Sequence, residues 1–218
     1  MAQKLVKYVT QEEFESMLKE VKDKKIKLAM LLGFEAGLRI SEIVGLYDLG
    51  SQCCKAKIIK EKVNRLGVQK KVIAYKCSAC SKILSIREMC RSKNFGWEIE
   101  PLRQERVKDS MLEIVGAKGE KDRVVPRPKR MNEKAVALLP LEISRRTLQR
   151  AITELGLKIL KKDISFHSLR HGFGSHMAGQ GRPLHEIQMF MGHSRLDTTG
   201  IYLHSNPQIA AEKAREIF

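Results

Sequence analysis

Apolar residues recur at helical spacing in several stretches of the 218-residue chain, and these stretches predict a mainly helical fold. The first begins at Thr10, which forms a capping box with Glu13 and is followed by an apolar series that reaches Val21. Gly37 is expected to end the second helix as a left-handed stop, and Ser41 to cap the third. The helices that we expect lie at residues 24–35, 42–46, 132–138, 144–157, 165–179, 184–191 and 207–218, with a short capped one after Asp197.

Two pairs of strand-like segments interrupt these helices. Residues 111–115 and 123–125 flank a turn rich in glycine, lysine and aspartate, which predicts a β-hairpin. Residues 72–75 and 83–86 are the second pair. The expected fold class is therefore α+β, mainly α with a small β-hairpin sheet and a small β-rich insert.

Side chains suited to phosphate chemistry gather between residues 167 and 202. His167 and Arg170 lie three positions apart, so they share one face of a helical turn. Further on, His193 follows a glycine and precedes Tyr202 by nine residues. A tyrosine can attack a phosphodiester when cations hold the phosphate and acid/base groups handle the protons. Arginine suits the first task because its planar fork binds two phosphate oxygens and stays charged.

This arrangement resembles the tyrosine recombinase family, which comprises phage integrases and Xer-like proteins. That family carries His-x-x-Arg, a later Gly-His, and a tyrosine nine residues after that histidine. Its earlier Gly-Leu-Arg-x-Ser-Glu box is matched by Gly37-Leu38-Arg39-Ile40-Ser41-Glu42, and its hairpin lysine before Val-Pro is matched by Lys118. The matches follow the family's order and leave out residues 50–108, so the resemblance implies the tyrosine recombinase catalytic-domain fold.

The resemblance also implies a role for each matched residue. Two arginines clamp the scissile phosphate, the tyrosine attacks it to form a 3′-phosphotyrosyl link, and the hairpin lysine protonates the leaving 5′-hydroxyl. One histidine assists proton transfer from the tyrosine, and the other hydrogen-bonds the phosphate. Because the covalent link keeps the bond energy, no ATP or catalytic metal is required. The two arginines are Arg39 and Arg170, the tyrosine is Tyr202 and the lysine is Lys118. His167 is the histidine that assists proton transfer, and His193 is the one that hydrogen-bonds the phosphate.

Two further residues and two partners follow from the same resemblance. Lys121 is an alternative to Lys118, and His171 is expected to support the His167 site. The expected partners are double-stranded DNA and further copies of the chain, because the family's strand exchange uses four protomers on two duplexes.

Residues 50–108 are expected to form an insertion in a catalytic domain that occupies residues 1–218. Arg39 and Lys118 lie 79 positions apart, whereas the family usually needs far fewer residues between them. The segment holds 15 Lys and Arg against five Glu and no Asp, so it carries ten of the sixteen net positive charges. It is therefore the most basic part of the chain.

All five cysteines fall in this segment. Cys77 and Cys80 form a Cys-x-x-Cys knuckle between two short strands, which resembles half of a zinc ribbon. Cys53, Cys54 and Cys90 do not repeat that spacing, but any two of them could complete four sulfur ligands. A structural zinc is the expected cofactor; the alternative is that reduced cysteines pack as small hydrophobic residues.

The net charge of +16 favours a polyanionic partner, without separating DNA from RNA or from an anionic membrane surface. Apolar runs stay shorter than a membrane span, and the N-terminus lacks a signal-peptide core. We therefore expect a cytoplasmic protein.

The expected function is that of a site-specific DNA recombinase or integrase. Fewer than ten residues precede the first expected helix, whereas family members usually carry a DNA-clamping domain there. The alternative is therefore a DNA-binding regulator that does not cut, or an orphan catalytic fragment, that occupies recombination sites. A type IB topoisomerase uses similar chemistry, but the box from Gly37 to Glu42 favours a recombinase.

Overall fold

The computed structural model describes residues 7–47, 97–116 and 122–192, together with the strands at 52–53, 56–63, 72–77 and 83–84. In chain order the elements are α1 (Gln11–Glu20), α2 (Lys24–Phe34), α3 (Ile40–Val44), β1 (Leu46–Tyr47), β2 (Gln52–Cys53), β3 (Ala56–Val63), β4 (Val72–Cys77), β5 (Ile83–Leu84), β6 (Trp97–Ile99), η1 (Gln104–Arg106), β7 (Met111–Ile114), β8 (Arg123–Pro126), α5 (Glu133–Val136), α6 (Arg145–Leu155), η2 (Gly156–Leu160), α7 (Phe166–Gly179) and α8 (Leu184–Met191).

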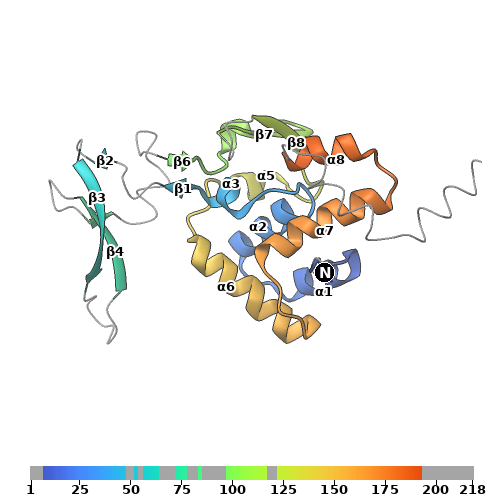
Figure 1. Cartoon of the computed structure of the whole chain (residues 1–218), viewed down its shortest axis with the longest axis horizontal. Helices are drawn as coiled ribbons and strands as arrows, with labels where there is room; N and C mark the ends of the chain where they lie inside the picture. Colours follow the sequence, from blue (N-terminus) through green and yellow to red (C-terminus); the bar gives the residue numbers. More distant parts are fainter. Residues whose placement is uncertain are drawn as a thin grey trace, which may run out of the picture.

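Helix α7 lies at the centre of the helical body and contacts α1, α2, α6 and α8 (Figure 1). It approaches α2 closely because Gly172 has no side chain. A Cβ at this position would lie 2.4 Å from the carbonyl oxygen of Val9 and 2.5 Å from the ring of Phe34. The Phe34 ring in turn stacks on Phe14 of α1, with ring centroids 4.1 Å apart. This apolar packing fixes the helix that carries His167 and Arg170.

The starts of the first three helices follow local hydrogen bonding. Thr10 caps α1 in the expected capping box, and the carboxylate of Asp23 caps α2. The expected cap at Ser41 is wrong, because α3 begins two residues earlier than expected, at Ile40, and Arg39 is its N-cap. The reason is Glu42, whose Oε2 accepts the backbone N–H of Arg39 at 2.7 Å. A motif arginine is thereby held at the entrance of a helix.

The hairpin of β7 and β8 confirms the expected strand pair. The strands are antiparallel, with Leu112 opposite Val125 and Ile114 opposite Arg123. Leu112, Ile114 and Val125 are buried in the core. Arg123 lies two residues before Val125 and therefore on the same inward face, where it is also buried.

Two further sheets lie between α3 and η1. Strands β1 and β6 pair with each other, so the chain leaves the helical body at Tyr47 and returns beside it at Trp97. Strands β2, β3, β4 and β5 form an antiparallel sheet in that order, which Figure 1 shows on the left, away from the helices. The expected strands at 72–75 and 83–86 correspond to β4 and to a shorter β5.

Helix boundaries match the expectations in the second half of the chain, with two differences. Helix α5 is a single short turn, and α6 ends in the π-helical turn η2. The expected helices around Tyr202 and at 207–218 lie outside the described residues. In the part of the chain that the structure describes, no helix has both the length and the apolar character needed to cross a membrane.

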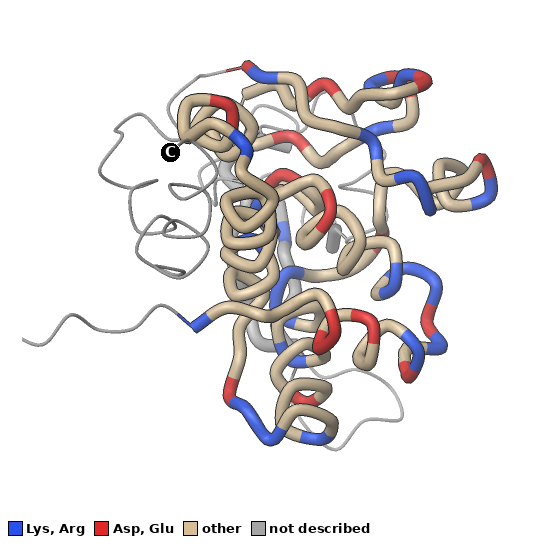
Figure 2. The backbone as a smooth tube through the Cα atoms, turned by 90° about the vertical axis from the view of Figure 1, so that its right-hand side faces the viewer, with Lys and Arg blue, Asp and Glu red and all other residues tan. Residues whose placement is uncertain are grey.

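Acidic and basic positions are interspersed along the described helices (Figure 2). Arg130, in the segment after β8, donates to Glu15 of α1 and to Glu35 at the end of α2. Such exposed pairs contribute about 0–1 kcal/mol each. The fold therefore depends on its apolar core, and these pairs add little to its stability.

A pair of glycine substitutions measures how tightly the core holds the turn after α2. A Cβ at Gly37 would lie 2.6 Å from the Phe173 ring at a φ of +65°, whereas a Cβ at Gly116 would meet no atom within 4 Å at a φ of +64°. We expect Gly116→Ala to lower the free energy of unfolding by about 1–2 kcal/mol, the cost of left-handed backbone. Gly37→Ala should lower it by about 2–4 kcal/mol, because the ring must also shift. Urea denaturation measures both, and equal losses would contradict a tight contact at Phe173.

Candidate active site

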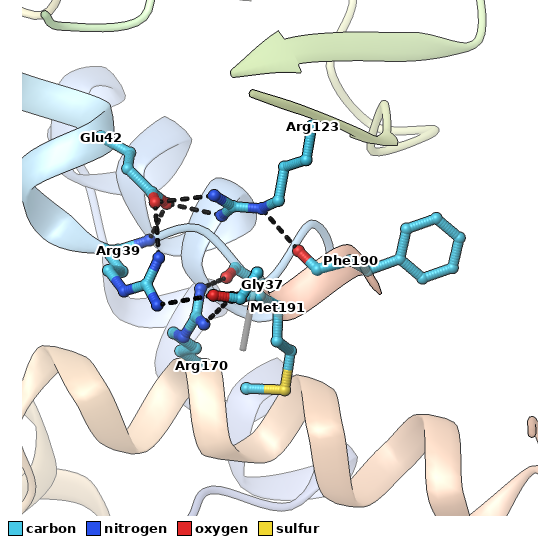
Figure 3. A network of polar contacts seen from close by, with 8 residues as sticks. Gly37, Arg39, Glu42, Arg123, Arg170, Phe190 and Met191 are labelled. Carbon is cyan, nitrogen blue, oxygen red and sulfur yellow. Dashed lines mark hydrogen bonds and ion pairs between the residues drawn. The ribbon is translucent and has the colours of Figure 1, made fainter. Parts of the chain in front are cut away.

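The carboxylate of Glu42 lies at the centre of a network of arginine side chains (Figure 3). Arg123 binds it through two hydrogen bonds, from Nη1 to Oε1 at 2.9 Å and from Nη2 to Oε2 at 2.8 Å. Arg39 binds the same carboxylate through its Nη1, at 2.9 Å from Oε1, and through its backbone N–H. Each carboxylate oxygen therefore accepts two hydrogen bonds, which compensates for the burial of the charge.

The C-terminal end of α8 is bound by the same arginines. The last carbonyls of a helix lack partners within the helix and lie at the negative end of its dipole, so cations stabilise them. Arg123 Nε donates to the carbonyl of Phe190 at 2.8 Å. Arg170 Nη2 donates to the carbonyl of Met191, and Arg39 Nη2 donates to that of Gly192 at 3.3 Å. Three consecutive carbonyls, the last two of α8 and that of its C-cap Gly192, thus accept hydrogen bonds from arginines of three other segments.

Arg39 and Arg170 differ in their access to solvent. Arg170 is 1% exposed, and its Nη1 also donates to the carbonyl of Gly37 at 2.5 Å. Arg39 leaves 23% of its side chain exposed. Part of the Arg39 side chain is therefore open to solvent, while the guanidinium of Arg170 lies beneath the end of α8.

Glu42 stays ionised in this network. Burial by itself raises the pKa of its carboxylate, but the hydrogen bonds and charge of Arg123, the backbone N–H of Arg39 and the charge of Arg170 outweigh burial and lower the pKa to about 2. Together, the Glu42 carboxylate and the guanidiniums of Arg39, Arg123 and Arg170 carry a net charge of +2. Such a cluster favours an anion at its exposed edge.

His167 and His171 lie one turn apart on α7, beside the arginines. Their rings meet edge to face, with centroids 4.5 Å apart. One side of His167 is exposed, but burial of the rest of its ring, and then the charges of Arg170 and Arg39, lower its pKa below 6.5. Burial, and then the charges of His167 and Arg170, lower the pKa of His171 to about 4. Both imidazoles are therefore mostly neutral at pH 7, and the exposed one can accept a proton.

The structure brings together Arg39, His167 and Arg170 from the expected catalytic set, since both arginines donate to the end of α8 and His167 lies one turn before Arg170. The other expected residues lie outside the described part of the chain: Lys118, His193 and Tyr202, with Lys121 and the cysteines Cys54, Cys80 and Cys90. Of Cys53 and Cys77 only the strand backbone is described.

Arg123 is the residue of this cluster that sequence reasoning missed. It lies in the hairpin motif that contains Lys118, but no role was assigned to it. The available signal was its position in a strand, two residues before the inward-facing Val125. A charged residue at a position expected to be buried needs a partner, and that partner is Glu42.

Comparison with known proteins gives the family to which this fold belongs. The model of the phage integrase family matches residues 98–208. This match spans half of the chain, and the chain belongs to the phage integrase family.

Among curated proteins, the chain is similar to the tyrosine recombinase XerA of Thermococcus kodakarensis. The two are 29% identical over 136 residues, which cover 55% of this chain and 45% of that protein. The tyrosine recombinase XerD of Staphylococcus aureus is 30% identical over 112 residues, which cover 41% of this chain and 38% of that protein. The chain thus spans less than half the length of each of these relatives.

Solved structures confirm the expected catalytic-domain fold. The crystal structure of XerA recombinase has a TM-score of 0.57 at 19% identity, covering 99% of this chain and 66% of that chain. XerH recombinase, in a post-cleavage complex with a palindromic difH substrate, has a TM-score of 0.56 at 17% identity, covering 97% and 53%. The catalytic domain of bacteriophage HP1 integrase has a TM-score of 0.50 at 16% identity, covering 91% and 88%.

His171 is expected to make the folded state sensitive to acid. Its pKa is about 4 in the folded protein against 6.5 for a free histidine, so the unfolded chain takes up the extra proton first as the pH falls. The contribution of the neutral imidazole to stability is present above pH 6.5 and is lost as the pH falls towards 4. His171→Gln should abolish this part of the stability loss on acidification, which is on the order of 2 kcal/mol.

Urea denaturation at pH 7 and at pH 4.5 measures this effect. His176→Gln is the matched control, because His176 is an exposed histidine on the same helix. Between pH 7 and pH 4.5 the control variant should lose as much stability as the wild type does. Parallel pH curves for His171→Gln and the wild type would contradict the depressed pKa.

Proposed function

We propose that the chain is a site-specific DNA recombinase or integrase that cuts and rejoins DNA through a 3′-phosphotyrosyl intermediate. The observation that supports this most directly is the joint anchoring of Arg39 and Arg170. These residues come from motifs 131 positions apart, yet they donate to neighbouring carbonyls at the end of α8, with His167 one turn away. Guanidiniums held in this way resist reorganisation when negative charge develops on a phosphate.

Phosphate binding begins at Arg39 in this proposal, because its side chain is more exposed to solvent than that of Arg170. Arg170 adds positive charge from beneath. Because Arg170 is 1% exposed, a phosphate oxygen can reach it only if the groups that cover it move, such as the carbonyl of Met191 or of Gly37, which the phosphate would then replace. Oxyanions are stronger acceptors than peptide carbonyls, so this exchange favours the bound phosphate.

The covalent step needs a nucleophile, a base and an acid. The hydroxyl oxygen of Tyr202 attacks phosphorus while the neutral imidazole of His167 accepts its proton. The phosphorus–oxygen bond to the 5′-oxygen breaks, and Lys118 supplies the proton for that oxygen. His193 hydrogen-bonds the phosphate. A 5′-hydroxyl from a partner strand then reverses the steps and rejoins the DNA.

Double-stranded DNA is the proposed partner, in a tetramer that holds two duplexes, in the cytoplasm. The net charge of +16 supports a nucleic-acid partner. The alternative is a regulator or orphan fragment that occupies recombination sites without cutting. Covalent chemistry separates the two, because only the enzyme forms a bond to DNA.

Capture of the covalent adduct on a nicked suicide duplex tests this function. The wild type should form an adduct that maps to Tyr202. Tyr202→Phe removes only the attacking oxygen, so it should bind the duplex with unchanged affinity and form no adduct. Arg39→Ala should slow adduct formation by about 10²–10³-fold. Arg182→Ala, which removes an exposed arginine outside the cluster, should react like the wild type at saturating protein.

Two results would refute the assignment. An adduct in Tyr202→Phe, or one mapped to another tyrosine, would exclude Tyr202 as the nucleophile. Binding without any adduct in the wild type, on duplexes that it recognises, would favour the regulator.

We also propose that residues 50–108 form an inserted unit that holds a structural zinc. The pairing of β1 with β6 supports the insertion, because it brings Tyr47, just before the segment, beside Trp97 within it. The strand register supports the metal site. Cys53 lies opposite Ala56 and Cys77 opposite Ile58, so β2 and β4 both end beside the first residues of β3. The chain leaves both strands at the same end of the sheet, as the two knuckles of a zinc ribbon require.

Elemental analysis of the purified protein should find about one zinc per chain, with four of the five cysteines protected from thiol reagents. Chelation should make all five thiols reactive while the circular dichroism of the helices persists, because the core helices lie outside the segment. Cys77→Ser should lose the zinc. Zinc-free native protein with five reactive thiols would support the alternative of packed, reduced cysteines.

A further inference from the structure

We propose that Arg123 is a positioning residue for DNA cleavage, which holds the Glu42 carboxylate and the end of α8 together and thereby directs the Arg39 guanidinium. The expected effect on cleavage rests on the proposed function. The positioning itself is a property of the folded chain and can be tested without DNA.

The guanidinium of Arg123 uses all three of its nitrogens in this role. Nε donates to the carbonyl of Phe190, and Nη1 and Nη2 donate to the two oxygens of Glu42. Its side chain is 5% exposed and that of Glu42 is fully buried. Arg123 therefore has no surface for a phosphate, and its contribution to cleavage must pass through the groups that it holds.

Arg39 depends on both of those groups. Its Nη1 and backbone N–H donate to Glu42, and its Nη2 donates to the carbonyl of Gly192. Arg123 fixes the first acceptor through a planar, two-bond contact, which limits rotation of the carboxylate. A lysine at position 123 could keep the charge but could not make the three bonds in one plane.

Arg123 also packs directly against the end of α8. A Cβ at Gly192 would lie 3.1 Å from both Cδ and Nη1 of Arg123. Gly192 has a left-handed φ of +58°, and its carbonyl is the one that Arg39 binds. One side chain of β8 therefore sets both acceptors of Arg39, while the same strand begins five residues after Lys118.

The charges around Glu42 determine how the contact between Glu42 and Arg39 depends on pH. Arg39 at the start of α3, Arg123 of β8 and Arg170 of α7 face the carboxylate, with His167 and His171 further along α7. Burial alone raises the pKa of Glu42, and Arg123 is the main influence that lowers it. Without Arg123 the carboxylate should therefore take up a proton at mildly acidic pH, and it would then bind Arg39 more weakly.

The rate of adduct formation on the nicked duplex, at saturating protein, measures the effect on cleavage. We expect Arg123→Met to react about 10²-fold more slowly with unchanged DNA affinity, because the phosphate clamp is misdirected. The rate of Arg123→Lys should lie between that of Arg123→Met and that of the wild type. The acid limb of the rate–pH profile should move to higher pH in Arg123→Met, and Glu42→Gln in the same chain should remove that movement.

Arg127→Met is the matched control. Arg127 follows the same strand and donates to the carbonyls of Met131 and Lys108 and to Glu133, away from the cluster. Its loss should lower stability and leave the rate and its pH profile unchanged. Thermal unfolding of every variant gives its folded fraction, and each cleavage rate is corrected for that fraction.

Nitrogen-15 NMR of the arginine side chains provides the readout without DNA. Arg39 should give a guanidinium signal protected from solvent exchange, assigned through Arg39→Lys. This protection should be lost in Arg123→Met and kept in Arg127→Met. If the wild type forms no adduct, the proposed function fails and this readout still decides the role of Arg123.

Two results would overturn the role of Arg123. One is that Arg123→Met cleaves DNA at the wild-type rate once the rate is corrected for the folded fraction. The other is a protected Arg39 signal that survives in Arg123→Met. If that variant does not fold, Arg123→Lys decides, because a wild-type rate and a protected Arg39 there would contradict the need for the planar contact.

Discussion

The buried carboxylate of Glu42 is the interaction on which the rest of the cluster depends. It lies among guanidiniums that would otherwise repel one another in a region with little water, and both of its oxygens are fully used. Breaking a buried ion pair by removing one partner costs about 3–5 kcal/mol, because it leaves the other charge without compensation. The end of α8 adds the dipoles of its last carbonyls to the same balance. Charge compensation, and not apolar contact, therefore joins α3, β8 and the end of α8 at this point.

Local signals predicted the parts of the fold that depend on neighbours in sequence. The cap at Thr10, the hairpin of β7 and β8, and the end of α8 at Gly192 all follow from residues within a few positions of one another. Arg39 and Arg170 were expected at one site because they belong to motifs with fixed spacing, and both donate to the end of α8. Arg123 was missed because its partner Glu42 lies 81 positions away, and only the folded chain brings β8 beside α3. The cap at Ser41 was wrong for a related reason, since Glu42 bonds back to Arg39.

The strands between α3 and η1 show a different limit of sequence reasoning. In β3 the adjacent Ile58 and Ile59 break the alternation of polar and apolar residues that marks a strand with one buried face. Strands β1 and β6 are two and three residues long, too short to carry any periodic pattern. Their existence depends on pairing across a gap of about fifty positions, which no local window contains. Strands β4 and β5 were predicted instead from the strand-like runs at 72–75 and 83–86, and they pair with each other.

The anchored end of α8 also shortens the tether of the proposed nucleophile. The carbonyl of Gly192 accepts a hydrogen bond from Arg39, and Tyr202 lies ten positions further along the sequence. Even as a random chain, ten residues have a root-mean-square reach of about 17 Å. A group on such a tether has an effective concentration in roughly the millimolar range near its anchor. The phenol would therefore search a small volume around the arginines, and any change that releases the end of α8 would dilute it.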